Sequence, residues 1–417
     1  MLPIYLIVTA AFALIAWRDL RFSLLLLIAL LPSYLLRTEI FGVPTTLLEM
    51  MLIVFVIVWF VKNGVSPIFK GGSRGVTVAM TLLLLASLIS LIIAPDHLSA
   101  LGVWKAYFLE PILLFFIIRS EKLDATRIFK ALGLTALVLS IVAIAQWVTT
   151  KGIPIPWDFE RRVTSVFDYP NALGLFLGPI VILGFMSWRT TSRWFWILTI
   201  VLSTTAIVLA QSEAAIVAVL ATLLIIGLTN PKTKNGTAVA FFVCAALIAL
   251  SPWRGFMIEK LTLQDYSGQV RLTQWSETFE MLKDHWFLGA GLSGYPTVFE
   301  RYHKAIHIEI FQYPHNILLN IWVELGVLGV IAFGLLAFQV LRTVPPTSSP
   351  FSALGRARPT GEASPPLIAF FALLETTIHG LVDVPYFKND LAILTWILLA
   401  IVCTYAPHTP PAQNKKE

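Results

Sequence analysis

The sequence predicts an all-α, polytopic transmembrane helix bundle of about 12–13 spans, with one large helical extracytoplasmic loop late in the chain. The first observation is composition, since 57% of the 417 residues are hydrophobic and only 13% are charged. Soluble proteins carry about 25% charged residues. The second is a mean hydropathy of +0.80. The third is that many apolar runs approach or reach the roughly 17–25 residues that a helix needs to cross a bilayer.

The apolar runs are expected to be helices because lipid offers the backbone no hydrogen-bond partner. Thirteen candidate spans follow one another along the chain: Leu2–Trp17, Phe22–Leu36, Pro44–Val61, Val76–Ala94, Leu101–Ile118, Phe129–Val148, Ala172–Trp188, Trp194–Ala210, Ala214–Leu228, Gly236–Leu250, Asn316–Leu341, Leu367–Val384 and Leu391–Tyr405. Since the first two are short, a single broken element is an open alternative, which would leave twelve spans.

Lys and Arg are unevenly distributed among the predicted loops. One alternating set of loops carries most of them, with Arg18, Arg127 and Lys232 as examples, whereas Ile93–Ala100 and Gln211–Ser212 have none. Cytoplasmic loops are enriched in these residues, so the first set is predicted to be cytoplasmic and the long loop to face outside. The same bias largely explains the net charge of +6, which therefore does not indicate nucleic acid as a partner.

The expected organisation has four parts. Residues 1–250 form an N-terminal transmembrane bundle, and residues 251–315 form an extracytoplasmic loop with amphipathic helices. Residues 316–405 supply C-terminal transmembrane helices, and residues 406–417 form a disordered cytoplasmic tail. A cytoplasmic linker rich in Pro, Ser and Gly is expected over Thr343–Pro366.

The long loop is a candidate functional region, because about sixty residues are too many for a mere connection. Its apolar residues recur at helical spacing, at Leu272, Trp275, Phe279 and Leu282. This spacing predicts an amphipathic helix over about Gly268–His285. Arg271 lies one turn before Trp275, near the edge of the apolar face, and an ordinary surface arginine is the alternative to a functional one.

Three glycines of the loop, Gly289, Gly291 and Gly294, match the GxGxxG pattern of dinucleotide-binding proteins. That fingerprint requires a preceding strand and a βαβ unit, whereas an amphipathic helix is expected to precede these glycines. We therefore interpret them as a flexible turn between two loop helices and not as a nucleotide site.

Polar residues gather where the loop returns to the membrane. Pro314 cannot lie inside a helix, so the next span starts at or just after it, and Asn316 is a plausible N-cap. His315 then lies where helix N–H groups point outward, in a setting that favours anions, although a structural histidine is the alternative. Glu324 lies deeper in the span, where an ionisable group is a functional candidate unless it bonds another helix.

Other ionisable residues in the predicted spans indicate a polar cavity inside the bundle. They are Glu49, Lys105, Glu110, Glu213, Glu375, His379 and Asp383. Lys105 and Glu110 are a candidate ion pair, and His379 and Asp383 are four residues apart on one expected helical face. Such an interior fits a transporter as well as an enzyme.

The stretch from His315 to Gly329 resembles the signature of the O-antigen ligase and O-antigen polymerase superfamily, HNxxLxxxxExGxxG, in every position. Upstream, Arg271 and Trp275, followed by the glycine turn, are similar to the Arg-x-x-x-Trp helix and Gly-x-Gly turn of that family. Asn171, which follows Pro170 at the start of a span, resembles another family element. The resemblance covers roughly residues 165–385.

The resemblance implies an enzyme of the bacterial cytoplasmic (inner) membrane, multi-pass, with its active site on the extracytoplasmic face. It would transfer a glycan from a polyprenyl-pyrophosphate carrier to a hydroxyl of another glycan or of a lipid-linked sugar, with inversion and with no metal or cofactor. Arg271 would neutralise the pyrophosphate, and His315 would act as base. The residues expected to bind substrate are Arg161, Arg162, Asn171, Asn316, Glu324 and Asp383.

One departure from the family pattern concerns a Ser-Arg-Gly element, which members often carry at the start of a mid-chain span. Here Glu213 follows Ser212, so a carboxylate stands where the arginine is expected. Arg162 could replace that arginine; otherwise the chain has another substrate or is inactive. Three functions are therefore weighed: a glycosyltransferase, ligase-like or polymerase-like; a transporter or flippase for lipid-linked glycans; and an inactive scaffold of an envelope assembly complex.

Overall fold

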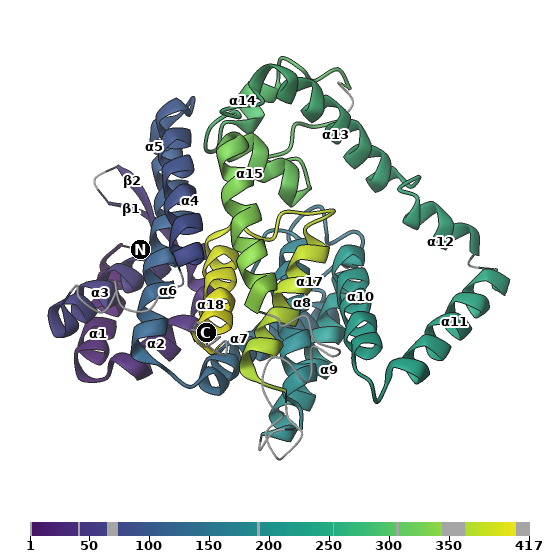
Figure 1. Cartoon of the computed structure of the whole chain (residues 1–417), viewed down its shortest axis with the longest axis horizontal. Coiled ribbons are helices and arrows are strands. Elements are labelled where there is room, and N and C mark those ends of the chain that lie inside the picture. The colour runs from purple at the N-terminus through teal and green to yellow at the C-terminus, as the bar shows by residue number, and fades with distance from the viewer. Residues whose placement is uncertain are drawn as a thin grey trace, which may run out of the picture.

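A computed structural model describes residues 2–40, 42–64, 74–189, 192–252, 254–305, 308–343 and 363–405. Helices account for most of this part of the chain, together with one two-stranded antiparallel sheet (Figure 1). The predicted all-α polytopic bundle is confirmed. The expected C-terminal tail and most of the expected linker, residues 344–362, lie outside the described residues.

The first half of the chain alternates long helices with short connections. Its elements are α1 (Leu2–Arg18), α2 (Leu20–Ala29), the 3-10 helix η1 (Leu31–Leu35), β1 (Arg37–Ile40), β2 (Val43–Thr46), α3 (Leu47–Asn63), α4 (Arg74–Ile93), α5 (His97–Trp104), the π-helical turn η3 (Lys105–Leu109), α6 (Glu110–Glu121) and α7 (Ala125–Thr149).

The second half contains the long loop, residues 251–316, between two groups of bundle helices. Its elements are α8 (Pro170–Ser187), α9 (Arg193–Leu209), α10 (Glu213–Thr229), α11 (Lys234–Leu250), α12 (Arg254–Leu261), α13 (Tyr266–His285), α14 (Tyr295–Phe299), α15 (Ile317–Thr343), α17 (Pro365–His379) and α18 (Asn389–Tyr405).

Five described helices are long and apolar enough to cross a membrane. They are Gly75–Ile93, His97–Glu121, Ala125–Thr149, Pro170–Ser187 and Ile317–Thr343. Lys234–Leu250 and Arg254–Lys260 would together add a sixth, although their axes differ by 111°. Six shorter apolar helices of 10–17 residues cover further predicted spans, and the number of crossings, twelve or thirteen, stays a prediction.

Two predicted spans in the first half of the chain are wrong at one end. The span Phe22–Leu36 loses its second half, because α2 ends at Ala29 and Pro32 lies in the first turn of the following 3-10 helix. The span Pro44–Val61 begins too early, because its first residues pair with β1 in the hairpin. There α3 starts only after Thr46, whose side chain forms a capping box with Glu49.

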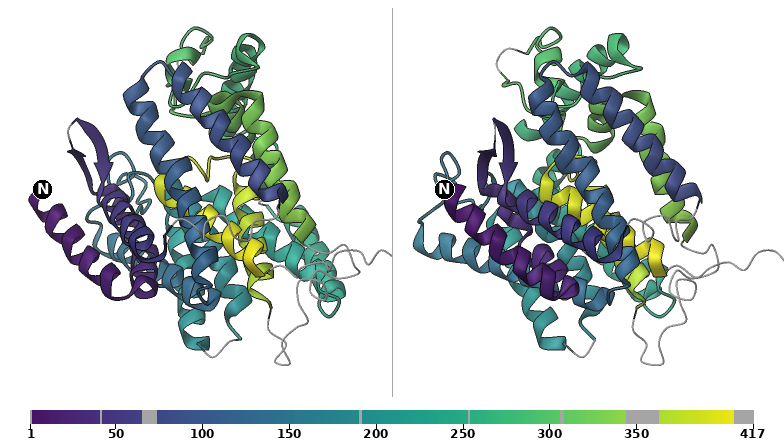
Figure 2. Two further views of the ribbon diagram at one scale, coloured as in Figure 1. Left: turned by 60° about the vertical axis from the view of Figure 1, so that its left-hand side comes forward. Right: turned by 90° about the vertical axis from the view of Figure 1, so that its left-hand side faces the viewer.

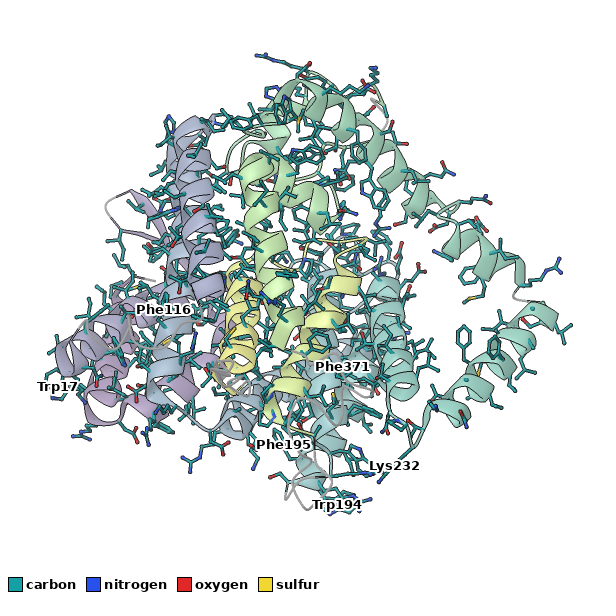
Figure 3. All side chains as sticks on the ribbon, in the orientation of Figure 1. Trp17, Phe116, Trp194, Phe195, Lys232 and Phe371 are labelled. Carbon is teal, nitrogen blue, oxygen red and sulfur yellow. The ribbon has the colours of Figure 1, made fainter. Side chains whose placement is uncertain are left out.

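The described part of the long loop covers one end of the bundle. In three views α13 and α14 lie at the same end, above the connection between α17 and α18 (Figures 1 and 2). Lys232 and Trp194 lie at the opposite end, whereas Phe371 of α17 lies within the bundle and is 1% exposed (Figure 3). Along the bundle, α15 packs on α4, and α17 packs between α8 and α18.

The helix that follows the loop is interrupted, and the loop fills the interruption. Gly326 inside α15 has φ 64° and ψ −168°, which breaks the helical hydrogen bonds. The Val327 amide donates to Phe287 O at 3.0 Å, and the Ala290 amide donates to Val323 O at 2.6 Å. Backbone groups released by the break are thus paired with the loop, as burial requires. As predicted, Gly289–Gly294 form turns between α13 and α14.

The predicted pair of Lys105 and Glu110 is corrected by the structure. Lys105 Nζ lies 3.1 Å from Glu49 Oε2 and 3.4 Å from Thr45 Oγ1. Lys105 opens the π-helical turn η3, so its register relative to α6 differs from that of a continuous α-helix. Its side chain consequently reaches α3 instead of Glu110.

Replacing Gly326 with alanine should loosen the loop from the bundle. A Cβ there would clash with Phe287 O, and the positive φ of Gly326 strains any L-residue. We expect the free energy of unfolding to fall by about 1–3 kcal/mol or more. The matched control is Gly334→Ala in the same helix, where a Cβ meets no atom within 4 Å. Thermal unfolding in detergent measures both, and equal melting temperatures would contradict the docking role of Gly326.

Candidate active site

His315 is held in an unusual backbone conformation directly before α15. Its φ is 47°, in the left-handed region. Asn316 caps the helix as predicted, because its Oδ1 accepts from the Leu318 and Leu319 amides at 3.0 and 3.1 Å. Its Nδ2 donates to Leu381 O at 2.9 Å. Surrounding contacts must stabilise a strained residue of this kind, and such residues concentrate at functional sites.

One face of α13 holds the chain that leads into His315. The predicted amphipathic helix Gly268–His285 is confirmed by α13. Gln274 Nε2 donates to Tyr313 O at 3.0 Å, and Trp275 Nε1 donates to Pro314 O at 2.7 Å. The indole of Trp275 thus contributes a polar contact that its place on an apolar face did not predict.

The connection between α17 and α18, residues 380–388, brings Arg271 and His315 together. Arg271 Nε donates to Val382 O at 3.1 Å. His315 Nδ1 lies 3.6 Å from Asp383 Oδ1. The two side chains that the sequence analysis proposed for one reaction therefore contact consecutive residues of a single segment.

The imidazole of His315 is oriented by its neighbours. The rings of Phe311 and Tyr313 both meet it edge to face, with centroids 5.0 Å away. Its side chain is 19% exposed and that of Asp383 is 1% exposed. The 3.6 Å separation is an ion-pair distance, longer than a hydrogen bond. Because Nδ1 faces the carboxylate, Nε2 is the nitrogen available to take a proton.

Asp383 does not lie on a helix, contrary to the expectation that it shares a helical face with His379. Helix α17 ends at His379, and Gly380 serves as its C-cap. The Gly380 carbonyl accepts from the Ile317 amide at 2.8 Å, and the Val384 amide, which a longer helix would pair with that carbonyl, bonds the Asp383 side chain instead. Asp383 is consequently part of the connection, and its Oδ1 accepts from the Val384 amide at 2.8 Å.

The predicted substrate-binding residues near α8 separate into two groups. Arg162 Nη2 lies 3.4 Å from Asn171 Oδ1, and its Nε donates to Ala210 O at 3.1 Å. These two residues thus lie together. Arg161 is turned away from them, since its Nη2 donates to Trp147 O at 3.0 Å and its guanidinium covers the Trp147 ring.

Two tyrosines join this region to His315. Tyr169, next to Pro170 at the start of α8, has its hydroxyl 2.8 Å from that of Tyr313. The ammonium of Lys388 lies 4.0 Å from the centroid of the Tyr169 ring. The sequence analysis missed all three side chains, because single aromatic and basic residues beside predicted spans have many structural uses.

Glu324 lies where the loop meets the break in α15. Its Oε2 accepts from the Ser293 amide at 2.7 Å, and its carbonyl accepts from Ser90 Oγ. The side chain is buried. These contacts give Glu324 a structural partner in the loop, and its predicted role in substrate binding stays a prediction.

Glu213, the residue that departs from the family pattern, also has a partner in the loop. Its Oε1 lies 2.9 Å from Lys260 Nζ, which lies 2.8 Å from Asp265 Oδ2. Asp265 in turn caps α13 by accepting from the Gly268 amide at 3.2 Å. Glu213 therefore connects α10 to the start of the helix that carries Arg271.

A second acidic residue of α13 organises the far part of the loop. Glu277 accepts from the Lys304 and Ala305 amides, each at 2.9 Å, and lies 2.9 Å from His303 Nδ1. Burial raises the pKa of Glu277, but the hydrogen bonds from His303 and the two amides outweigh it, so the pKa lies below its usual value. The carboxylate is therefore ionised at neutral pH and fixes residues 303–305.

Comparison with known proteins identifies one family. Residues 198–334 match the family model described as O-antigen ligase. No curated protein matches the chain. The matched segment includes Arg271, His315 and Asn316, whereas Asn171 and Asp383 lie outside it. Within the described residues, no group of three His, Cys, Asp or Glu side chains could hold a metal ion.

Replacing Trp275 with phenylalanine keeps an aromatic ring and removes the N–H that Pro314 O accepts. We expect the free energy of unfolding to fall by about 1–3 kcal/mol, the cost of an unpaired buried acceptor. Amide hydrogen exchange should also rise in peptides that cover residues 313–316. Trp286→Phe is the control, because Trp286 is about half-exposed and its indole N–H has no hydrogen-bond partner among the described residues. Unchanged exchange in Trp275→Phe would remove this residue from the support of His315.

Proposed function

Because residues 198–334 match the family model described as O-antigen ligase, we propose that the chain transfers a glycan from a polyprenyl-pyrophosphate carrier to a hydroxyl acceptor. The observation that carries the proposal is the meeting of Arg271 and His315 at Val382 and Asp383. An acid–base residue and a permanent cation, held at one segment outside the helices, suit a reaction with an anionic leaving group.

His315 is proposed as the general base. The acceptor hydroxyl loses its proton to Nε2 while its oxygen attacks the anomeric carbon of the donor sugar. The bond between that carbon and the pyrophosphate oxygen breaks, and its electron pair leaves with the pyrophosphate. Asp383 stabilises the imidazolium that forms, as the acid of a His–Asp pair does. Attack from the side opposite the leaving group inverts the anomeric centre.

Arg271 is proposed to hold the pyrophosphate. Its guanidinium is permanently charged, and its planar donors match phosphate oxygens. The contact of Nε with Val382 O and of Nη1 with Ser267 Oγ fixes the plane of the group. Arg162, with Asn171 beside it, is the proposed second cation, in the place of the arginine that Glu213 replaces. The reaction as written uses no metal and no cofactor.

The broken helix α15 bears on the transporter alternative. Transporters use discontinuous helices to coordinate substrate ions with released backbone groups. Here the backbone on both sides of Gly326 is hydrogen bonded to the loop at Phe287 and Ala290. The break therefore serves loop attachment, which favours the enzyme. Glu213 likewise has a structural partner in Lys260, so its departure from the family pattern does not require an inactive scaffold.

The enzyme is proposed to work in the bacterial cytoplasmic membrane with its site on the extracytoplasmic face. Both ligase and polymerase use this chemistry, and they differ in the acceptor. Purified protein incubated with a lipid-linked glycan and candidate acceptors separates them by product size. A ladder of products identifies a polymerase, and a single addition to a different acceptor identifies a ligase.

The orientation is tested by cysteine labelling in a variant whose own cysteines, Cys244 and Cys403, are replaced. Gln269→Cys, on the exposed side of α13, should react with an impermeant maleimide in cells stripped of any outer barrier. Lys232→Cys, at the opposite end of the bundle, should react only after lysis (Figure 3). The reverse pattern would overturn the extracytoplasmic placement of the site.

The chemical roles are tested by substitution in the transfer assay. His315→Ala should lower turnover by about 10²–10⁴-fold, the usual contribution of a positioned base, with little change in donor binding. Arg271→Ala should weaken donor binding as well, and Arg271→Lys should rescue it only in part, because lysine makes no bidentate contact.

His285→Ala is the matched control for His315, since His285 lies on the same loop and, among described aromatic residues, its ring meets only that of Tyr302, edge to face. It should keep wild-type turnover. Melting temperatures of all four variants exclude unfolding as the cause of any loss. A stable and fully active His315→Ala protein would end the case for acid–base catalysis by this residue.

A further inference from the structure

Lys388 shares the segment that Arg271 and His315 contact. It is the last residue of the connection between α17 and α18, and its side chain is half-buried. Arg271 contacts this connection at Val382, and His315 faces it at Asp383. A third basic group therefore belongs to the same short segment, five residues beyond the carboxylate that orients His315.

The ammonium of Lys388 is held at the site by an aromatic face. Nζ lies 4.0 Å from the centroid of the Tyr169 ring, a close cation–π contact. The hydroxyl of Tyr169 is hydrogen bonded to that of Tyr313, and the Tyr313 ring meets the imidazole of His315. This chain of contacts places Lys388 on the α8 side of His315. Arg271 approaches the connection from α13.

Lys388 differs in its charge partners from three other lysines of the structure. Lys105, Lys260 and Lys283 each lie within 3.1 Å of a carboxylate oxygen. No carboxylate oxygen of the described residues lies within 4.0 Å of Lys388 Nζ. Burial lowers the pKa of Lys388, and the nearby charges of Asp390 and Asp383 oppose that shift. A partly buried cation without a direct ion pair favours an anionic ligand.

We propose that Lys388 binds the pyrophosphate of the lipid-linked donor, on the side opposite Arg271. This proposal rests on the proposed function and names a residue that the sequence analysis did not. The ring of Tyr169 covers one side of the Lys388 ammonium, so the N–H donors of that ammonium remain for phosphate oxygens. Lysine binds phosphate as a compact point charge, which complements the planar fork of Arg271.

The position of Lys388 also answers an electrostatic difficulty of the site. Asp383 stabilises the imidazolium of His315, but its negative charge repels a pyrophosphate held beside the same histidine. A cation on the same segment offsets that repulsion without disturbing the His315–Asp383 pair. The base and the leaving-group site can therefore share one connection.

The first test measures binding of inorganic pyrophosphate to the purified full chain in lipid nanodiscs by calorimetry. Lys388→Met should weaken binding by about 10- to 100-fold, the effect of losing one charge-assisted hydrogen bond. Lys388→Arg keeps the charge and the cation–π contact, so it should bind nearly as the wild type. The control is Lys283→Met, which removes an exposed lysine that pairs with Glu280 on α13.

A second measurement uses the wild-type chain, in case Lys388→Met fails to fold. Pyridoxal 5′-phosphate carries a phosphate and an aldehyde that forms an imine with a lysine amine, and borohydride reduces the imine to a stable amine. Mass spectrometry should find the label on Lys388, with pyrophosphate protecting Lys388 and leaving Lys283 labelled. Absence of protection would overturn the proposal.

The outcomes separate this proposal from the proposed function. Unchanged pyrophosphate binding by a folded Lys388→Met protein overturns the role of Lys388, even where His315→Ala abolishes transfer. Weakened binding supports that role, even where the wild type transfers no glycan and the proposed function fails. A Lys388→Met protein that loses affinity for phosphatidylglycerol but not for pyrophosphate would show a lipid headgroup site, and it would also overturn the proposal.

Discussion

The break in α15 is the constraint on which the rest of the site depends. Burial leaves no room for unpaired backbone groups, so a helix interrupted at Gly326 must find hydrogen-bond partners elsewhere. The loop supplies them from Phe287 and Ala290, and the Glu324 carboxylate adds a bond to Ser293. These contacts attach the end of α13 to the bundle. They thereby fix the helix that carries Arg271 and Trp275.

Once α13 is attached, its polar face determines the geometry around His315. Gln274 and Trp275 bond the carbonyls of the two preceding residues, and Asn316 bonds Leu381 from the other side. The strained backbone of His315 is thus stabilised by contacts from α13 and from the connection between α17 and α18. Preorganisation of this kind would hold the proposed base in place without a cost at the moment of reaction.

Electrostatics at the site follow from the same arrangement. Asp383 is buried and faces the imidazole, so a negative charge lies close to where an anionic leaving group is proposed to bind. Arg271 on α13 and Lys388 at the C-terminal end of the connection bring positive charge to the same place. Glu213 adds no direct repulsion at this connection, because its carboxylate pairs with Lys260 at the start of the loop.

The sequence by itself determined the membrane class, the amphipathic helix α13 and the Asn316 cap, because apolar run length, helical spacing and the proline before a helix are local properties. It also singled out Arg271 and His315, each through its own short motif. Only the tertiary structure decided that Lys105 pairs with Glu49, that Asp383 lies beyond α17, and that Lys388 stacks on Tyr169. Each of these depends on packing between segments far apart in the chain, and the periodicity within one segment does not predict such packing.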